Sequence, residues 1–108
     1  MRQLKDQKEV DDWIKKSHQE KIVFFKHSFR CPISGSAKEE VEEFLAKHPD
    51  ITIVWVDVVD DRPISLYIAE QSNVTHQSPQ IILFHQGEPT WNTSHREITV
   101  ETLETHIL

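Results

Sequence analysis

The chain has 108 residues, of which 37% are hydrophobic, and its 12 lysines and arginines against 18 aspartates and glutamates give a formal net charge of −6. This length and apolar content suit one compact domain spanning residues 1–108. The first nine residues do not resemble a signal peptide, and the longest apolar runs are too short to cross a bilayer. Because an acidic protein is repelled by phosphate backbones and anionic lipids, we expect a cytoplasmic protein with no nucleic-acid and no membrane partner.

The first predicted elements are a short helix and a buried strand. Asp6 followed by Glu9 resembles a capping box, and one face of a helix is then marked at Val10, Trp13, Ile14 and Ser17. Residues 21–26 predict a strand. Its four central residues, 22–25, are all apolar, which is typical of a central strand that is covered on both faces.

The next segment predicts a second helix and a parallel strand. Between Pro32 and His48, apolar residues recur at helical spacing with charged residues on the opposite face, which indicates a long amphipathic helix. Residues 52–57 predict a buried strand, joined to the first by a right-handed parallel crossover. Asp60 or Asp61 can cap a following helix.

The second half of the chain predicts a hairpin and a last helix. Residues 80–85 and 88–93 form two strands that a tight turn at Gln86-Gly87 joins in antiparallel order. Thr99 caps the final helix. This order of elements, without repeat or linker, predicts an α/β fold with a four-stranded mixed sheet flanked by helices on both faces.

The single cysteine, Cys31, lies where the first predicted strand gives way to the long helix. Unpaired backbone N–H groups and the positive end of the helix dipole favour a thiolate at such a position, and the thiolate is the nucleophilic form. Because there is no second cysteine, any disulfide of Cys31 joins another molecule. Cys31 is therefore the candidate catalytic residue, and a lone cysteine also fits a reducing compartment.

Several groups must share the stabilisation of this thiolate. The helix dipole contributes about 0.3–1 kcal/mol, less than the ~1.4 kcal/mol that one pKa unit represents. Backbone N–H groups, nearby cations and a serine hydroxyl are expected to add to it, and the candidates are His27, Arg30, Pro32, Ile33 and Ser34. Ser34 stands where a Cys-x-x-Cys motif has its second cysteine. Since a hydroxyl cannot expel a mixed disulfide, turnover requires an external thiol.

Ser78 and Pro79 precede the strand predicted at residues 80–85. An X-Pro bond adopts the cis form at small cost, and such a bond would leave the backbone groups of Ser78 open beside the cysteine. These groups can pair with an extended substrate as an added strand does. Both residues are therefore candidate substrate-binding residues.

A cysteine at the first strand-to-helix junction and an X-Pro bond before the third strand together resemble the thioredoxin fold. The run Lys26-His27-Ser28 followed by Cys31-Pro32-Ile33-Ser34 resembles the signature of the monothiol bacilliredoxins. The stretches Trp91-Asn92-Thr93-Ser94-His95 and Ile98-Thr99 resemble that family's last strand and the start of its final helix. Phe29 and Arg30 differ from the small polar residues that are typical of the family at these two positions.

This resemblance implies a cis Ser78-Pro79 bond and one kind of exchange reaction. Bacilliredoxins take bacillithiol from a protein mixed disulfide onto their own cysteine, and a second low-molecular-weight thiol then clears it. The implied partners are bacillithiolated proteins and this thiol, with a disulfide reductase as a further candidate. Bacillithiol is the implied co-substrate, and no cofactor is tightly bound. Because bacillithiol carries malate carboxylates, Lys26, His27 and Arg30 are expected to attract its anionic end, with Lys26 a candidate substrate-binding residue.

Two other classes of function fit the same residues. In a thioredoxin-fold redox sensor or binding module, modification of Cys31 alters a protein contact without turnover. The chain is also similar in fold to monothiol glutaredoxins, which hold iron–sulfur clusters across a dimer. A metal site is not expected, because His27 and Cys31 supply at most half of a zinc site. Asp57, Asp60 and Asp61 are interpreted as strand-end solvation and a helix cap.

Overall fold

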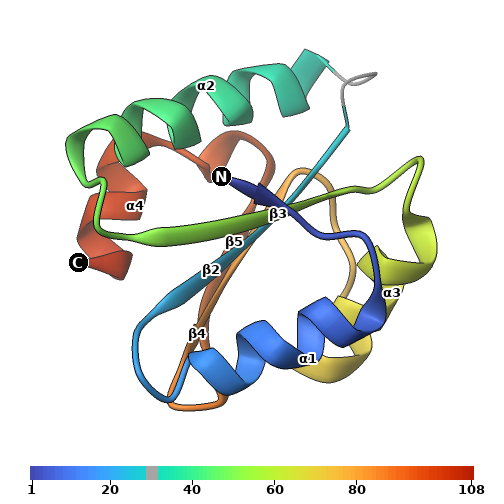
Figure 1. Ribbon diagram of the computed structural model, residues 1–108. Helices are drawn as coiled ribbons and strands as arrows, with labels where there is room; N and C mark the ends of the chain where they lie inside the picture. Colours follow the sequence, from blue (N-terminus) through green and yellow to red (C-terminus); the bar gives the residue numbers. More distant parts are fainter. Residues whose placement is uncertain (29–31) are drawn as a thin grey trace.

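The computed structural model describes residues 1–28 and 32–108, with only the backbone of Ile33 (Figure 1). The strands are β1 (Arg2–Gln3), β2 (Ile22–His27), β3 (Thr52–Asp57), β4 (Gln80–His85) and β5 (Glu88–Ser94). The helices are α1 (Gln7–Lys16), α2 (Pro32–Lys47), α3 (Arg62–Ser72) and α4 (Val100–Ile107), and a short 3-10 helix, η1, spans His95–Glu97.

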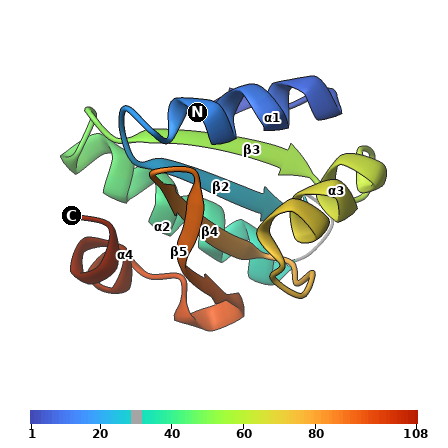
Figure 2. The ribbon, with the colours of Figure 1, turned by 90° about the horizontal axis from the view of Figure 1, so that it is seen from below.

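The described strands form one mixed sheet in the order β1-β3-β2-β4-β5. β2 lies at its centre, where it pairs in parallel with β3 and antiparallel with β4. Figure 2 shows α1 and α3 on one side of this sheet and α2 and α4 on the other. The predicted α/β fold with helices on both faces is therefore confirmed.

The sheet has one strand more than the four predicted. β1 is only two residues long and pairs in parallel with β3, with Arg2 opposite Val54. The Leu4 N–H extends this pairing by donating to the Trp55 carbonyl at 2.7 Å. A strand of two residues is too short to show an alternating pattern in the sequence. β1 is therefore recognised only from its pairing with β3 in the structure.

β2 is buried along its whole length because helices cover both of its faces. Val23 and Phe25 face α2 and α4, in a core that includes Phe44 and Leu103. Ile22 and Phe24 face α1 and α3, in a second core that includes Val10 and Ile68. The unbroken apolar run of the sequence correctly predicts this burial on both sides.

Two predicted helix caps are present. Asp6 accepts a hydrogen bond from the Glu9 N–H at 2.8 Å, and Thr99 accepts one from the Thr102 N–H at 3.1 Å. In a capping box the Glu9 carboxylate would accept from the N–H of the N-cap residue, Asp6. Here it accepts instead from the N–H of Lys5, one residue earlier.

The start of α3 differs from the prediction. Asp61 occupies the N-cap position, but its side chain makes no capping hydrogen bond. Instead, Asp57 at the end of β3 accepts from the N–H groups of Val59 and Asp60 at 2.9 and 3.1 Å. Asp57 therefore shapes the turn between β3 and α3, which is a structural role as the sequence suggested.

The tight turn between β4 and β5 is docked on the end of α1. Gln86 and Gly87 both have positive φ, 57° and 80°, as the two central residues of a type I′ turn require. The Gln86 N–H donates to the Ser17 carbonyl at 2.7 Å, and the Gly87 N–H donates to the Ser17 hydroxyl at 2.9 Å. The His18 ring closes over Gly87, where an added Cβ would lie 2.6 Å from Nε2.

Replacing Gly87 with alanine is expected to lower the free energy of unfolding by about 1 kcal/mol, because alanine at this positive φ is strained. The matched control is Gly35→Ala in α2, where, among the described residues, no atom outside the local helix backbone lies within 4 Å of the added Cβ. This change is expected to raise the free energy of unfolding by about 0.5–1 kcal/mol through helix propensity. Urea denaturation measures both, and equal shifts in the same direction would contradict the assignment of the turn.

Candidate functional site

The site predicted from sequence lies at one edge of the sheet. The parallel β2 and β3 end together there, with His27 opposite Asp57, and β4 begins beside them, with Gln80 opposite Lys26. This register brings the start of α2 and the Ser78-Pro79 bond to the same edge. Phe29, Arg30 and Cys31 lie outside the described residues, so the roles predicted for Arg30 and Cys31 stay predictions.

Ser34 joins the end of β2 to the first turn of α2. It is completely buried, and its hydroxyl oxygen accepts a hydrogen bond from the Ser28 N–H at 3.2 Å. This bond uses a lone pair of the oxygen and leaves the hydroxyl proton available to another acceptor. Ser34 thus has the packing role that the sequence allowed, and it retains the capacity to donate to a sulfur.

The start of α2 provides a positive potential. Pro32 is its first residue, is exposed, and has no N–H that would need a partner. The N–H groups of Ile33 and Ser34 follow in the first turn, where helices have no intrahelical acceptors. No acidic residue occupies this turn to offset the dipole. We therefore expect this helix start to stabilise an anion beside it.

His27 is placed differently from the expectation that it supplies a positive charge. It is buried on the α2 side of the sheet, with its ring 4.8 Å from that of Phe25 and 4.6 Å from that of Trp55. Burial lowers the pKa of His27, and the nearby Asp57 opposes this shift only in part. The imidazole is therefore mostly neutral at pH 7, and His27 contributes packing instead of charge.

Lys26 is also placed differently from its predicted role. It faces the opposite side of the sheet, toward α3, and none of its surface is accessible. Its ammonium donates a hydrogen bond to His76 Nδ1 at 3.3 Å. Burial lowers the pKa of Lys26 to about 8. A direct contact of Lys26 with a ligand in solvent does not fit this position, because β2 is covered by helices up to its last residue.

The Ser78-Pro79 bond is cis, as the resemblance implied. Ser78 is half-buried and Pro79 is buried. The Pro79 carbonyl accepts a hydrogen bond from the His95 N–H at 2.9 Å, so the segment before β4 is tied to η1. His95 has φ of 57°, a conformation that non-glycine residues rarely adopt.

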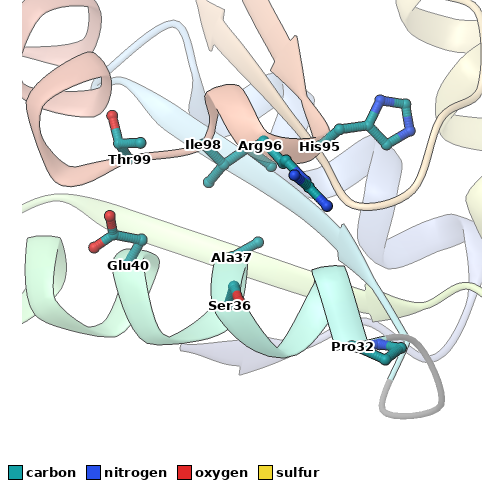
Figure 3. Close-up of a pocket in the computed structure, with 8 residues that line it drawn as sticks. All are labelled: Pro32, Ser36, Ala37, Glu40, His95, Arg96, Ile98 and Thr99. Atoms are coloured by element: carbon teal, nitrogen blue, oxygen red, sulfur yellow. The ribbon is translucent and has the colours of Figure 1, made fainter.

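A pocket of about 350 Å³ opens between the start of α2 and η1 (Figure 3). Pro32, Ser36, Ala37 and Glu40 line it from α2, and His95, Arg96, Ile98 and Thr99 line it from the opposite side. In Figure 3 the Arg96 side chain extends from η1 toward α2, while Glu40 and Thr99 mark the other end. The pocket therefore has a cationic part and an anionic end, next to the residue that follows Cys31.

Sequence reasoning missed Arg96 and Glu40. Glu40 belongs to the charged face of an amphipathic helix, where carboxylates are usually only solvated. Arg96 comes two residues after a strand, in a 3-10 helix that the sequence pattern did not predict. The sequence did show a basic residue shortly after the last predicted strand, which could have marked Arg96 as a candidate. Only the fold shows that this residue lies opposite α2.

Residues 1–28 and 32–108 contain neither a metal-binding cluster nor a membrane-spanning helix. No three histidine, aspartate or glutamate side chains in this part lie close enough to hold a metal ion together. None of its helices combines the length and the apolar character that crossing a bilayer requires.

Comparison with known proteins agrees with this geometry. The family model of the monothiol bacilliredoxin BrxC matches residues 2–103. A solved structure described as a candidate oxidoreductase with a thioredoxin fold is 33% identical over 96% of this chain and 90% of its own, with a TM-score of 0.88.

More distant solved structures share the fold. Mitochondrial thioredoxin 3 from Saccharomyces cerevisiae, in its oxidised form, is 20% identical over 99% of this chain and 92% of its own, with a TM-score of 0.77. Thioredoxin from Fasciola hepatica is also 20% identical, over 99% of this chain and 96% of its own, with a TM-score of 0.79. The thioredoxin-like fold predicted from the sequence is confirmed.

The depressed pKa of Lys26 predicts a pH-dependent stability. The folded-state pKa of about 8 lies below the ordinary lysine value of 10.5, so the unfolded chain binds more protons between these values. Stability therefore rises with pH across this window, by about 3 kcal/mol in total. Lys26→Met removes the group, so the variant is expected to lack this rise.

Urea denaturation of both proteins at several pH values between 7 and ~11 measures this difference. Lys15→Met, at an exposed position of α1, controls for the loss of one positive charge. If Lys26→Met and the unmodified chain gain stability equally with pH, the burial of the ammonium is contradicted.

Proposed function

The chain belongs to the monothiol bacilliredoxin BrxC family, which implies thiol–disulfide exchange, and we propose that Cys31 performs this exchange on protein mixed disulfides with bacillithiol. The observation that carries the proposal is that the family match spans residues 2–103 and so includes the only cysteine of the chain. Pro32, directly after it, begins a helix without acidic residues in its first turn.

The proposed reaction has two balanced steps. In the first, the Cys31 thiolate attacks the bacillithiol sulfur of a modified protein. The old disulfide breaks, the protein leaves as a thiolate, and Cys31 and bacillithiol form a new disulfide. In the second, the thiolate of another bacillithiol molecule attacks the bacillithiol sulfur on Cys31. Cys31 leaves as a thiolate, and bacillithiol disulfide is the product. The chain is neither oxidised nor reduced overall.

The thiolate is stabilised mainly by α2 in this proposal. The N–H groups of Ile33 and Ser34 and the helix dipole favour a negative charge at the helix start. The Ser34 hydroxyl keeps its proton for the sulfur, because its bond with Ser28 uses only the oxygen lone pair. Lys26 and His27 take no part as cations, since one is buried on the far side of the sheet and the other is mostly neutral.

The pocket between α2 and η1 suits the small thiol. Its cationic part, formed by Arg96, offers a planar fork of donors that matches a carboxylate, and the malate part of bacillithiol carries such groups. Glu40 at the other end repels carboxylates, so the pocket favours one orientation of the ligand. Bacillithiol held in this way would keep its sulfur near the start of α2.

Ser78 and Pro79 are proposed to bind the protein substrate. Ser78 is half-buried and precedes β4 at the edge where β2 ends. Its backbone groups can pair with an extended segment around the modified cysteine, as an added strand does. This supports a substrate that is recognised by its backbone more than by its sequence.

Incubation of the chain with a bacillithiolated protein is expected to transfer one bacillithiol to Cys31, as seen by intact mass spectrometry. Added bacillithiol should then restore the free thiol over many turnovers, while Cys31→Ser should show no transfer. Alkylation of Cys31 at different pH is expected to give a midpoint below the ~8.5 of an ordinary cysteine. Transfer without turnover would instead support a redox sensor, and an unchanged mass would refute the proposal.

Arg96→Gln is expected to raise the KM for bacillithiol in the second step about tenfold, because one charge-assisted hydrogen-bonded pair with a carboxylate is lost. The rate of Cys31 alkylation by the neutral reagent iodoacetamide should stay within about twofold, since the helix start is intact. Arg2→Gln, at an exposed position in β1, is the control for net charge. Equal KM values for both variants would exclude Arg96 from the binding site.

A further inference from the structure

A buried polar cluster lies beneath the segment that leads to Pro79, on the side of the sheet away from α2. It consists of Lys26 from β2, Ser65 from α3 and His76 from the loop between α3 and β4. Lys26 and Ser65 are both completely buried, whereas His76 is half-buried. The exchange reaction proposed above does not use any of these three side chains.

Both of the other side chains in the cluster contact the same atom, His76 Nδ1. Lys26 Nζ and the Ser65 hydroxyl each lie 3.3 Å from this nitrogen. An ammonium group can only donate, so Nδ1 must be the acceptor and the ring proton is on Nε2. Residues 26 and 76 are 50 positions apart in the chain, so the contact fixes the loop to the centre of the sheet.

The same loop is internally ordered and leads directly to the site. The Gln80 side chain accepts from the Gln77 N–H at 3.3 Å and donates to the Thr75 carbonyl at 3.0 Å. Pro79 then accepts from the His95 N–H, which connects the loop to the pocket containing Arg96. A displacement of residues 73–78 would therefore alter both proposed binding regions.

We propose that His76 is a positioning residue for the exchange reaction: by accepting hydrogen bonds from Lys26 and Ser65 at Nδ1, it anchors residues 73–78 and so holds Ser78 and Pro79 in place for the protein substrate. This inference rests on the proposed function, because it assumes that the substrate lies against Ser78 and Pro79. Protonation of Nδ1 removes the acceptor and places two cations face to face, so it releases the loop.

The surroundings of His76 set the pH at which this happens. Within residues 1–28 and 32–108, the charged groups that act on it are Lys26 from β2 and Arg62 from α3, and both disfavour a second positive charge. Burial and these two cations lower the pKa of His76 below its ordinary value of 6.5. The anchor is therefore intact at pH 7 and is lost as the pH falls below the usual histidine range.

Two substitutions separate anchoring from simple packing. His76→Asn places an amide oxygen close to the position of Nδ1 and cannot be protonated, so it keeps the acceptor at every pH. His76→Leu fills similar space but offers no acceptor. At pH 7 we expect the KM for a bacillithiolated peptide to rise about five- to tenfold in His76→Leu and less than about twofold in His76→Asn.

The pH profile of KM is the decisive measurement. As the pH falls from 7 to below the usual histidine range, the KM of the unmodified chain should rise, whereas that of His76→Asn should stay constant. Alkylation of Cys31 by iodoacetamide, followed over the same range, reports the thiolate fraction and should be the same in both proteins. If the two KM profiles coincide, His76 does not position the substrate and the inference is overturned.

Hydrogen exchange of residues 73–78, measured by mass spectrometry at pH 7, tests the anchor without any substrate. Exchange should be about five- to tenfold faster in His76→Leu and unchanged in His76→Asn. Equal exchange in all three proteins overturns the inference. Should the unmodified chain not accept the bacillithiolated peptide, the proposed function fails, while this exchange measurement still decides whether His76 anchors the loop.

Discussion

The burial of β2 on both faces, up to its last residue, is the constraint on which the rest of this structure depends. Because helices cover both sides of the strand, consecutive residues must each find a place in one of two interiors. Lys26 and His27 end the strand and are buried on opposite sides, although both are polar. Burial lowers the pKa of both groups, so His27 is mostly neutral at pH 7, whereas Lys26, with a pKa of about 8, stays mostly protonated. The Lys26 ammonium is held by His76 on the α3 side of the sheet, so neither residue offers an exposed cation.

The positive potential comes from elements that follow in the chain. The first turn of α2 offers unpaired N–H groups and no acidic side chain, and Arg96 reaches toward it from η1 (Figure 3). Ser34 fixes the start of this helix to the end of β2 through the Ser28 N–H, so both flanks of residues 29–31 are held by one buried hydrogen bond. In the proposed reaction a serine at this position is consistent with a monothiol mechanism, because it supports the helix start without competing for the disulfide.

The sequence predicted the features that depend on local patterns. It did not predict the features that depend on contacts between residues far apart in the chain. Asp6 and Thr99 cap helices as expected, and the run Ile22–Phe25 is central as its apolar character indicated. The two-residue β1 and the basic η1 carry no periodic signal. The orientation of Lys26 follows from its register beside Gln80, which only the assembled sheet defines. A lysine close to a cysteine therefore suggested a ligand contact that its position in the sheet does not allow.

The absence of a second cysteine places a geometric demand on this edge of the sheet. A protein substrate and a small thiol must both reach the same sulfur, and in the proposed reaction they do so in turn. The Pro79 carbonyl and the His95 N–H join the segment proposed for the protein to the wall of the pocket proposed for the thiol. A ligand in either region therefore contacts a backbone that the other region shares. In the proposal His76 anchors the loop that leads to this shared backbone, so a single proton on its ring would act on both binding events, whereas the thiolate is stabilised mainly by α2.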